Sequence, residues 1–84
     1  MIVRIEKALK KLRDKSLEKK VAFCIEHVMT VESISEIKNL KILKGSDIHF
    51  RIRVGDYRIG LIINRGEIDF VRILHRKEIY RYFP

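Results

Sequence analysis

Three arginines surround one predicted tight turn in the second half of this chain. Arg51 and Arg53 precede Gly55-Asp56, and Arg58 follows it. A two-residue loop with glycine first suits a type II′ hairpin turn. In that register Arg53 lies opposite Arg58, and Arg51 lies opposite Gly60. Since alternate residues of a strand share a face, the three guanidinium groups project from one side of the predicted sheet.

This grouping of like charges indicates a possible anion site. Like charges directly opposite each other destabilise a sheet, unless an anion normally sits between them. The planar fork of arginine binds phosphate in a bidentate way, and Gly60 leaves space on the same face where a ligand backbone could approach. A solvated outer face gives the same pattern, because 19 basic residues cluster easily by chance. From the pattern alone, both interpretations stay open.

The C-terminal tail adds basic and aromatic side chains close to this predicted site. His75-Arg76-Lys77 and Tyr80-Arg81-Tyr82 follow the last predicted strand, where they would flank the arginine face. Aromatic residues among basic ones are the usual surface for single-stranded RNA, and tyrosine can stack on a base or act as an acid. Phe83, in contrast, is expected to pin the tail to the core.

The elements that must position these groups begin with a strand and two helices. Met1 to Ile5 is rich in β-branched residues, which favours a strand. Apolar residues at helical spacing then predict two helices that pack as an antiparallel hairpin. Ser33 to Glu36 has the pattern of a capping box, which predicts one more helical turn. The first helix carries Ile5, Ala8, Leu9 and Leu12, and the second, which begins near Asp14 or Ser16, carries Leu17, Val21, Cys24, Ile25, Val28 and Met29.

The second half of the chain changes to the period of a strand. Apolar residues alternate from Ile48 to Val54 and from Tyr57 to Ile63, on either side of the predicted turn. After a second tight turn at Arg65-Gly66, Ile68 to Leu74 is nearly all apolar, which suits a central strand covered on both faces. His75 to Pro84 is expected to form a final helical turn. The order β-α-α-β-β-β with a short tail predicts an α+β fold, and 84 residues predict one domain, residues 1–84.

Composition narrows the kinds of partner and chemistry. Nineteen Lys and Arg against eleven Asp and Glu give a net charge of +8, which favours polyanionic partners. Cys24 is the only cysteine, so an internal disulfide and a four-cysteine metal site are excluded. His27, His49 and His75 lack metal-ligand spacing, and no nucleotide-binding motif occurs. We therefore expect no metal and no cofactor.

The apolar runs of the chain and the charges near its start indicate where in the cell the protein is expected. No apolar run approaches the ~20 residues that a membrane span needs. Charges at Arg4, Glu6 and Lys7 interrupt the apolar stretch that a signal peptide requires. We therefore expect a cytoplasmic protein with no membrane partner.

Two motifs in the chain resemble the signature of the RelE/ParE superfamily of toxins. Phe50 to Arg58, FRIRVGDYR, is similar to the family's YRIRVGDYRI hairpin, and His75 to Tyr80, HRKEIY, is similar to its HRKDIY tail. The order of predicted elements matches that of the family along the whole chain. The resemblance implies a toxin of a type II toxin–antitoxin system, with an N-terminal strand and a helical hairpin on an antiparallel sheet. It also implies a cognate antitoxin protein as partner.

RelE-like members of this superfamily cleave messenger RNA in the ribosomal A site without a metal, and the 2′-hydroxyl of the RNA is the nucleophile. Such a reaction requires a base for the hydroxyl, cations for the phosphorane and an acid for the leaving 5′-oxygen. The resemblance gives catalytic roles to Arg58, Arg76, Tyr80 and Arg53, and the surface pattern adds Arg51, His75, Lys77 and Arg81 as RNA-binding residues.

One departure from the family pattern keeps other functions open. RelE-type enzymes commonly carry lysines where this chain has Arg51 and Arg53, and arginine does not give up its proton. Arg53 is therefore a poor general base. Three possibilities remain: His75 or Tyr80 takes the proton of the 2′-hydroxyl, stabilisation of the transition state by positive charge is sufficient for cleavage, or the protein does not cleave RNA. The alternatives are a ParE-like, non-catalytic inhibitor of DNA gyrase and a basic RNA- or ribosome-binding module without activity. The dense arginine face favours RNA cleavage.

Overall fold

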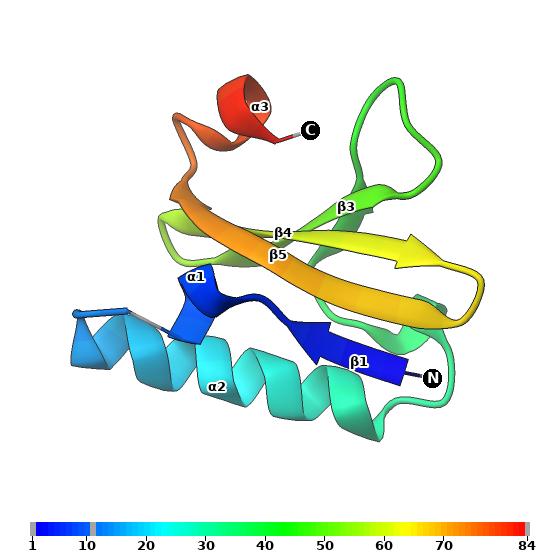
Figure 1. The fold of residues 1–84 in the computed structure, drawn as a ribbon, viewed down its shortest axis with the longest axis horizontal. Coiled ribbons are helices and arrows are strands. Elements are labelled where there is room, and N and C mark those ends of the chain that lie inside the picture. The colour runs from blue at the N-terminus through cyan, green and yellow to red at the C-terminus, as the bar shows by residue number, and fades with distance from the viewer. Residues whose placement is uncertain (1, 11, 84) are drawn as a thin grey trace.

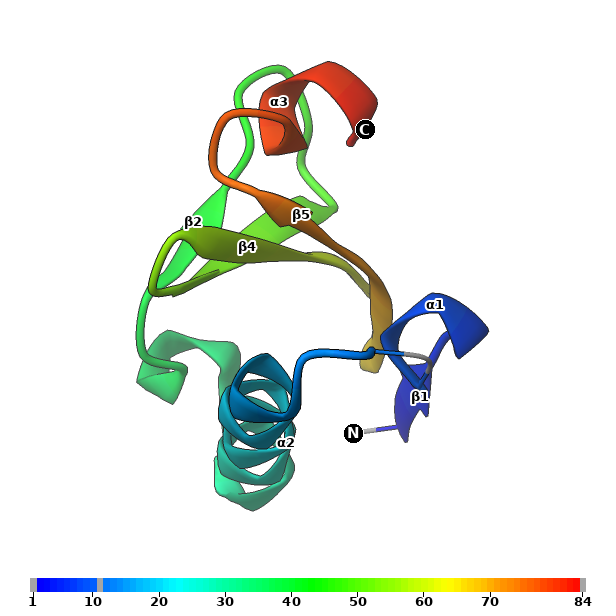
Figure 2. The same ribbon diagram turned by 90° about the vertical axis from the view of Figure 1, so that its left-hand side faces the viewer.

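The fold is described by a computed structural model that covers residues 2–10 and 12–83. Met1 and Pro84, the predicted limits of the first strand and of the tail, lie outside this range. The elements are β1 (Ile2–Ile5), α1 (Lys7–Lys10), α2 (Lys15–Thr30), the 3-10 helix η1 (Ile34–Glu36), β2 (Leu40–Ile42), β3 (His49–Val54), β4 (Tyr57–Asn64), β5 (Glu67–His75) and α3 (Ile79–Tyr82). Helices α2 and α3 lie on opposite sides of one sheet (Figures 1 and 2), and the predicted α+β class is confirmed.

The sheet contains the predicted meander and one further strand at each side of it. Its order is β1-β5-β4-β3-β2, so the antiparallel β3, β4 and β5 are its three inner strands. At one edge β1 pairs in parallel with β5, with Ile5 beside Phe70. At the other edge β2 pairs antiparallel with β3. As predicted, β5 is an interior strand, although the sheet is mixed and not wholly antiparallel.

The predicted helical hairpin is reduced to one helical turn followed by one long helix. The periodic residues assigned to a first helix are divided between two elements, since Ile5 belongs to β1 and, among the described residues of this segment, only Lys7–Lys10 is helical. Pairing of β1 with β5 holds Ile5 in the sheet, a tertiary contact that overrides the local helical period. Leu9 is nevertheless buried, as its place in the predicted apolar face requires.

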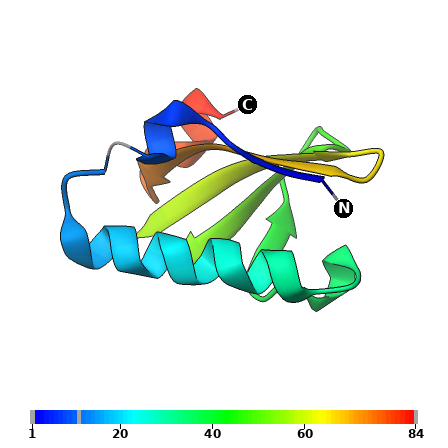
Figure 3. The same cartoon turned by 60° about the horizontal axis from the view of Figure 1, so that its bottom comes forward.

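Helix α2 covers one face of the sheet. The Asp14 carboxylate caps it by accepting from the backbone N–H groups of Ser16 (2.9 Å) and Leu17 (3.1 Å). Leu17, Val21 and Val28 are buried as predicted, whereas Met29 is 64% exposed. Met29 was predicted on the apolar face, but it follows Val28 by about 100° around the helix, which carries it beyond the edge of the buried stripe. Figure 3 shows α2 running across the sheet.

Apolar residues gather on both faces of the sheet. On the α2 face, the main cluster of buried residues comprises Leu9, Leu17, Val21, Val28, Ile37, Ile52, Ile59, Leu61, Ile68 and Phe70. On the other face, a smaller cluster joins Leu43, Ile79 and Phe83, with Ile62, Val71 and Leu74 packed against it. The tail is thus pinned by Ile79 and Phe83, and the structural role predicted for Phe83 is confirmed. No helix among residues 2–10 and 12–83 is long and apolar enough to cross a membrane.

A β-bulge changes which residues of β5 lie on each face. Gly60 pairs with Arg72 but Leu61 pairs with Phe70, so Val71 has no partner of its own on β4. After a bulge the alternation of side chains is shifted by one residue. Ile73 therefore joins the main cluster on the α2 face, while Arg72 is placed on the opposite face, across from Gly60.

Candidate functional site

The β3–β4 hairpin places three arginines on one face in the predicted register. Arg53 pairs with Arg58, and Arg51 pairs with Gly60. Gly55 has φ +59 in the two-residue turn, a left-handed conformation that glycine adopts without steric strain. This face is opposite to the one that α2 covers, because Ile52 and Ile59 alternate with these residues and are buried under α2.

Arg58 lies at the centre of the cationic group. Its Nη1 donates to the carbonyl oxygens of Gly55 and Tyr57, both at 2.9 Å, which holds the guanidinium against the turn. The pKa of Arg58 is lowered from its ordinary value, first by partial burial and then by the charges of Arg51 and Arg53. Its charged form is therefore held among other cations, the arrangement expected where an anion binds.

The tail brings two further predicted residues to Arg58. The backbone N–H of Arg76 donates to the carbonyl oxygen of Asp56 (2.8 Å), which ties the residue after β5 to the hairpin turn. The charge of Arg76 also lowers the pKa of Arg58, whereas Tyr80 raises it. The side chain of Tyr80 is 65% exposed on α3, so its phenol is accessible from solvent. We call Arg51, Arg53, Arg58, Arg76 and Tyr80 the arginine cluster.

The positive charge of the arginine cluster is not neutralised by nearby carboxylates. Within the part of the chain that the structure describes, ion pairs at 4.0 Å or less join only Arg4 to Glu67 (2.7 Å) and Arg4 to Asp69 (3.8 Å). Both of those carboxylates belong to β5, near its start and beside β1. An unpaired cluster of this kind favours an anionic ligand with several oxygens, such as a phosphate.

Arg51 is held by a residue that the sequence did not single out. Its Nη1 donates to the carbonyl oxygen of Asn39 at 2.8 Å, and the backbone N–H of Arg53 donates to the same oxygen at 3.3 Å. Asn39 adopts φ +63, the left-handed region that asparagine tolerates better than most residues. The Nε of Arg51 is buried and has no acceptor in the described structure. Asn39 therefore fixes the orientation of Arg51 from the start of β2.

The space expected beside Gly60 is filled by the protein itself. A Cβ added at Gly60 would lie 2.8 Å from the Phe83 ring. The prediction that Gly60 leaves room for a ligand backbone is therefore wrong. The glycine instead allows the tail to pack closely on the sheet, and the ring of Phe83 also contacts His49 edge-on, with centroids 5.2 Å apart. On the sheet face opposite α2, the accessible surface is therefore the part that carries the arginines beside the β3–β4 turn.

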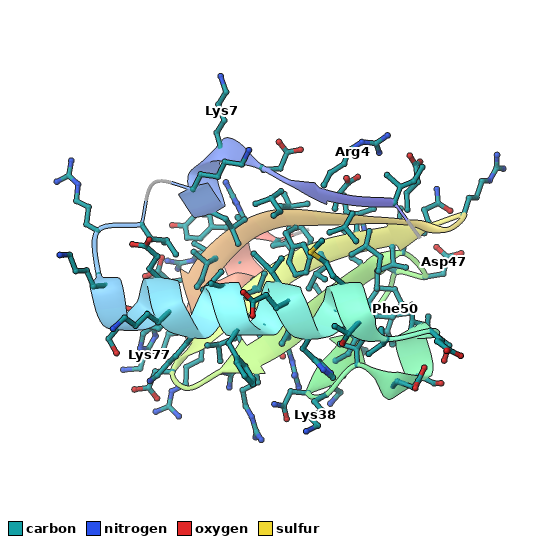
Figure 4. The ribbon with its side chains drawn as sticks, turned by 90° about the horizontal axis from the view of Figure 1, so that it is seen from below. Arg4, Lys7, Lys38, Asp47, Phe50 and Lys77 are labelled. Atoms are coloured by element: carbon teal, nitrogen blue, oxygen red, sulfur yellow. The ribbon has the colours of Figure 1, made fainter. Side chains whose placement is uncertain are left out.

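Three other predicted site residues lie apart from the centre of the cluster. His75 pairs with Tyr57, its ring meets the Tyr57 ring edge-on at 5.6 Å, and its Nδ1 accepts from the Lys77 backbone N–H. Since Tyr57 packs against the main cluster, His75 is on the face opposite Arg58. Lys77 is exposed near the β3–β4 turn (Figure 4), and the guanidinium carbon of Arg81 lies 6.0 Å from the Tyr82 ring centroid. RNA binding by these residues stays a prediction.

Two further cations share the face of the arginine cluster. Lys41 of β2 pairs with Arg51, a position hidden in sequence because the segment around β2 shows no clear period. Arg72 reaches this face only through the bulge, and its Nη1 donates to the Tyr82 carbonyl oxygen at 2.9 Å. Arg72 therefore supports the C-terminal end of α3, where a cation is favourable. No group of three metal-ligating side chains comes together among the described residues.

The arrangement can bind and stabilise a phosphate but offers few groups that move protons. Arginine stays protonated under physiological conditions, so it stabilises developing negative charge and does not act as a base. Tyr80 carries the one side chain of the cluster that can donate a proton to a leaving oxygen. The fold and this cluster define a small basic α+β protein with an exposed cationic group that is able to bind a phosphate.

Known proteins are similar to this chain in sequence and fold. The chain is 44% identical to Toxin RelE3 of Methanocaldococcus jannaschii over 69 residues, which are 81% of this chain and 78% of the relative. It is also similar to a chain in the RelB–RelE antitoxin–toxin complex from Methanococcus jannaschii, with a TM-score of 0.73, 37% identity and coverage of 96% of this chain and 99% of the other. A RelE–RelB complex from Pyrococcus horikoshii has the same fold at 23% identity, with a TM-score of 0.66 over 89% and 93% of the chains. No protein-family model matches the chain.

The sequence identity to Toxin RelE3, which extends over most of both chains, shows the family of this protein. This chain belongs to the RelE family, the toxins of toxin–antitoxin systems. The predicted resemblance is therefore confirmed at the level of the family.

Proposed function

We propose that this toxin is a ribosome-dependent, metal-independent messenger-RNA endoribonuclease that inhibits translation. The observation that carries the proposal is the arginine cluster: the charges of three arginines and the accessible Tyr80 act on Arg58, and none of the four arginines has a carboxylate within 4.0 Å among the described residues. A phosphodiester that turns pentacoordinate gains negative charge, and preorganised cations stabilise such a transition state most.

In the proposed reaction the 2′-hydroxyl of one nucleotide attacks the adjacent phosphorus while the bond to the leaving 5′-oxygen breaks. The products are a 2′,3′-cyclic phosphate and a 5′-hydroxyl, so no water or metal enters this step. Arg58 and Arg76 contact the phosphate oxygens, and Arg51 and Arg53 bind the adjoining backbone. Tyr80 donates the proton that the 5′-oxygen requires, because its phenol is exposed beside Arg58.

The weakest part of this arrangement is the general base. Arg53 does not lose its proton, and His75 lies on the opposite face of the sheet from Arg58. Charge stabilisation by the arginines therefore carries most of the proposed rate enhancement. The same observation favours a second candidate function, a non-catalytic inhibitor of DNA gyrase that uses the cationic face to bind its target.

The proposal includes two kinds of partner. The first is the messenger RNA in the ribosomal A site, which implies a cytoplasmic protein. The second is an antitoxin, as in the RelB–RelE complexes that resemble this chain. With a net charge of +8, the toxin favours an antitoxin segment that is acidic and that becomes ordered on binding.

The test is induced expression in a bacterial host with primer extension across an abundant message. We expect new 5′ ends within translated codons for the wild type, and their loss with Arg58→Ala. Arg65→Asn is the matched control: it also removes one arginine, but at the opposite end of β4, where φ +49 suits asparagine. Arg65→Asn should cleave like the wild type.

Each other outcome has a distinct meaning. Growth arrest with intact messages would reject the nuclease and favour gyrase as the target. Cleavage that persists in Arg58→Ala would show that the arginine cluster is not the catalytic site. Binding of RNA without arrest or cleavage would leave a basic RNA-binding module.

A further inference from the structure

A hydrogen bond at one edge of the sheet joins α2 to the segment that leads into β2. The Nε2 atom of His27 accepts from the backbone N–H of Lys38 at 3.2 Å. His27 is partly buried on α2, and Lys38 lies beside this helix in Figure 4. The helix that covers one face of the sheet therefore also holds the backbone just before β2.

The residue after Lys38 has a backbone conformation that depends on such contacts. Asn39 has φ +63, and a residue other than glycine keeps a left-handed conformation only where its surroundings hold it there. On one side of Asn39, the bond from Lys38 to His27 fixes the chain. On the other side, the Asn39 carbonyl oxygen accepts from Arg51 Nη1 at 2.8 Å and from the Arg53 backbone N–H at 3.3 Å. Hydrogen bonds and one short stretch of backbone therefore connect His27 with Arg51.

The side chain of Arg51 is sensitive to the position of that carbonyl oxygen. Its partner on β2 is Lys41, and like charges on paired strands repel each other. The buried Nε of Arg51 has no acceptor in the described structure, so it adds no hydrogen bond that would resist a movement of the guanidinium. The bond to Asn39 is therefore the contact that keeps the guanidinium in place against this repulsion.

We propose that His27 is a positioning residue for the arginine cluster, an inference that rests on the function proposed above. Through Lys38 and Asn39, it fixes the guanidinium of Arg51 in the orientation that binds the RNA backbone beside the cleaved bond. His27 acts from the side of the sheet that α2 covers and does not contact the RNA itself. The orientation of a cation on one face is thus determined by a contact on the other.

The first experiment follows Arg51 directly, by NMR of the purified full-length chain with isotope-labelled arginine. It measures how fast the Nε–H of Arg51 exchanges with solvent, and the signal that is missing from Arg51→Lys identifies this group. Exchange is slow in the wild type because the Nε atom is buried. His27→Leu removes the acceptor, and we expect exchange to become about three- to tenfold faster, the range that the loss of one hydrogen bond gives.

Two variants serve as controls for the loss of the acceptor. The amide oxygen of glutamine accepts a hydrogen bond as the unprotonated Nε2 of histidine does, so His27→Gln should exchange like the wild type. Thr30→Ala removes the 2.8 Å hydrogen bond that the Thr30 hydroxyl donates to the His27 carbonyl oxygen, a contact of the same helix that does not involve Lys38. It should also exchange like the wild type. Circular dichroism checks that each variant is folded.

Cleavage of a message on purified ribosomes tests the consequence for the proposed reaction. His27→Leu should lower the cleavage rate about three- to tenfold, whereas His27→Gln and Thr30→Ala should keep the wild-type rate. In an Arg51→Ala background, His27→Leu should change the rate by less than about twofold, because two substitutions that act through one contact are not additive.

The remaining outcomes separate the inference from the proposed function. Unchanged exchange at Arg51 in His27→Leu would overturn the inference, as would faster exchange with an unchanged cleavage rate. An equal loss of cleavage with and without Arg51 would show that His27 acts on the fold as a whole, which also overturns it. If the wild type cleaves no message, the proposed function is wrong, and the exchange rates alone then decide whether His27 fixes Arg51.

Discussion

The two faces of the sheet are used in different ways. Under α2 the apolar side chains form one continuous core that runs from Ile52 on β3 to Ile68 and Phe70 on β5. The opposite face is divided between a small apolar cluster around Phe83 and the arginine cluster beside the β3–β4 turn. One face therefore provides most of the burial that stabilises the fold, and the other holds like charges together.

The contrast between the two faces explains how a chain of 84 residues can hold an electrostatically unfavourable site. Pairing Arg53 with Arg58 opposes folding, because like charges across a sheet repel each other. The residues that alternate with them, Ile52 and Ile59, are at most 1% exposed under α2 and oppose that repulsion. Each strand thus contributes stability on one side and charge on the other. Substitutions on the two faces should accordingly affect different measurements.

The largest expected effect lies on the α2 face. Phe70→Ala should lower the free energy of unfolding by about 3–5 kcal/mol, because a fully buried aromatic side chain is replaced by a cavity. Urea denaturation followed by circular dichroism measures the change. Ile42→Ala, at a 45% exposed position of the edge strand β2, is the control and should cost less than half as much. Equal losses for the two variants would show that the main core is not where the stability resides.

A smaller effect is expected where the tail meets the other face. Gly60→Ala places a methyl group 2.8 Å from the Phe83 ring and should lower the free energy of unfolding by about 1–3 kcal/mol. Limited proteolysis should then cut within α3 faster than in the wild type. Phe83→Leu provides room, so the double variant should lose less than the sum of the two single losses. Additive losses would mean that Gly60 and Phe83 do not meet.

Asn39 should connect stability with the arginine cluster. Asn39→Val forces a β-branched residue into φ +63, so we expect a loss of about 1–3 kcal/mol in the free energy of unfolding. Its carbonyl oxygen, which accepts from Arg51, should also move, and we expect RNA cleavage to fall about tenfold, an order-of-magnitude figure for one misplaced contact. Asn39→Gly keeps both the conformation and the carbonyl oxygen and should behave like the wild type. Full cleavage by Asn39→Val would separate Arg51 from the proposed reaction.

The smallest effect concerns the thiol of Cys24. Partial burial raises the pKa of Cys24 to about 11, so less thiolate is present at neutral pH than in a free cysteine. Alkylation of the folded chain by iodoacetamide at pH 8 should be at least tenfold slower than that of the unfolded chain, an order-of-magnitude expectation from the thiolate fraction. The rate should rise steadily with pH up to about 11. Equal rates for folded and unfolded chains would contradict the burial of this side chain.

The sequence predicted most accurately where a local signal fixes the geometry. The glycine-first turn at Gly55 set the register of β3 and β4, and with it the pairing of Arg53 with Arg58. The capping pattern at Ser33 correctly predicted a helical turn, in which the Glu36 carboxylate accepts from the Ser33 backbone N–H at 2.9 Å. In both cases, neighbouring residues alone determine the backbone conformation.

Features that depend on distant contacts were not predictable. The nearly uniform apolar run of β5 hides the bulge at Val71, which sends Arg72 to the arginine face. Gly60 was interpreted as space for a ligand because sequence does not reveal that Phe83 returns to fill it. His75 was placed near the arginines because its strand position, opposite Tyr57, becomes fixed only by that bulge.

The proposed binding of RNA phosphates by the arginine cluster is tested by the salt dependence of binding to a short single-stranded RNA. For each phosphate contact, the slope of log Kobs against log salt concentration is roughly −0.7. We predict that Arg58→Ala weakens binding and makes the slope less steep by about one contact, while Arg65→Asn leaves affinity and slope as in the wild type. Identical slopes and affinities for Arg58→Ala and Arg65→Asn would contradict the claim, because the RNA would then respond to the overall charge of the chain and not to this cluster.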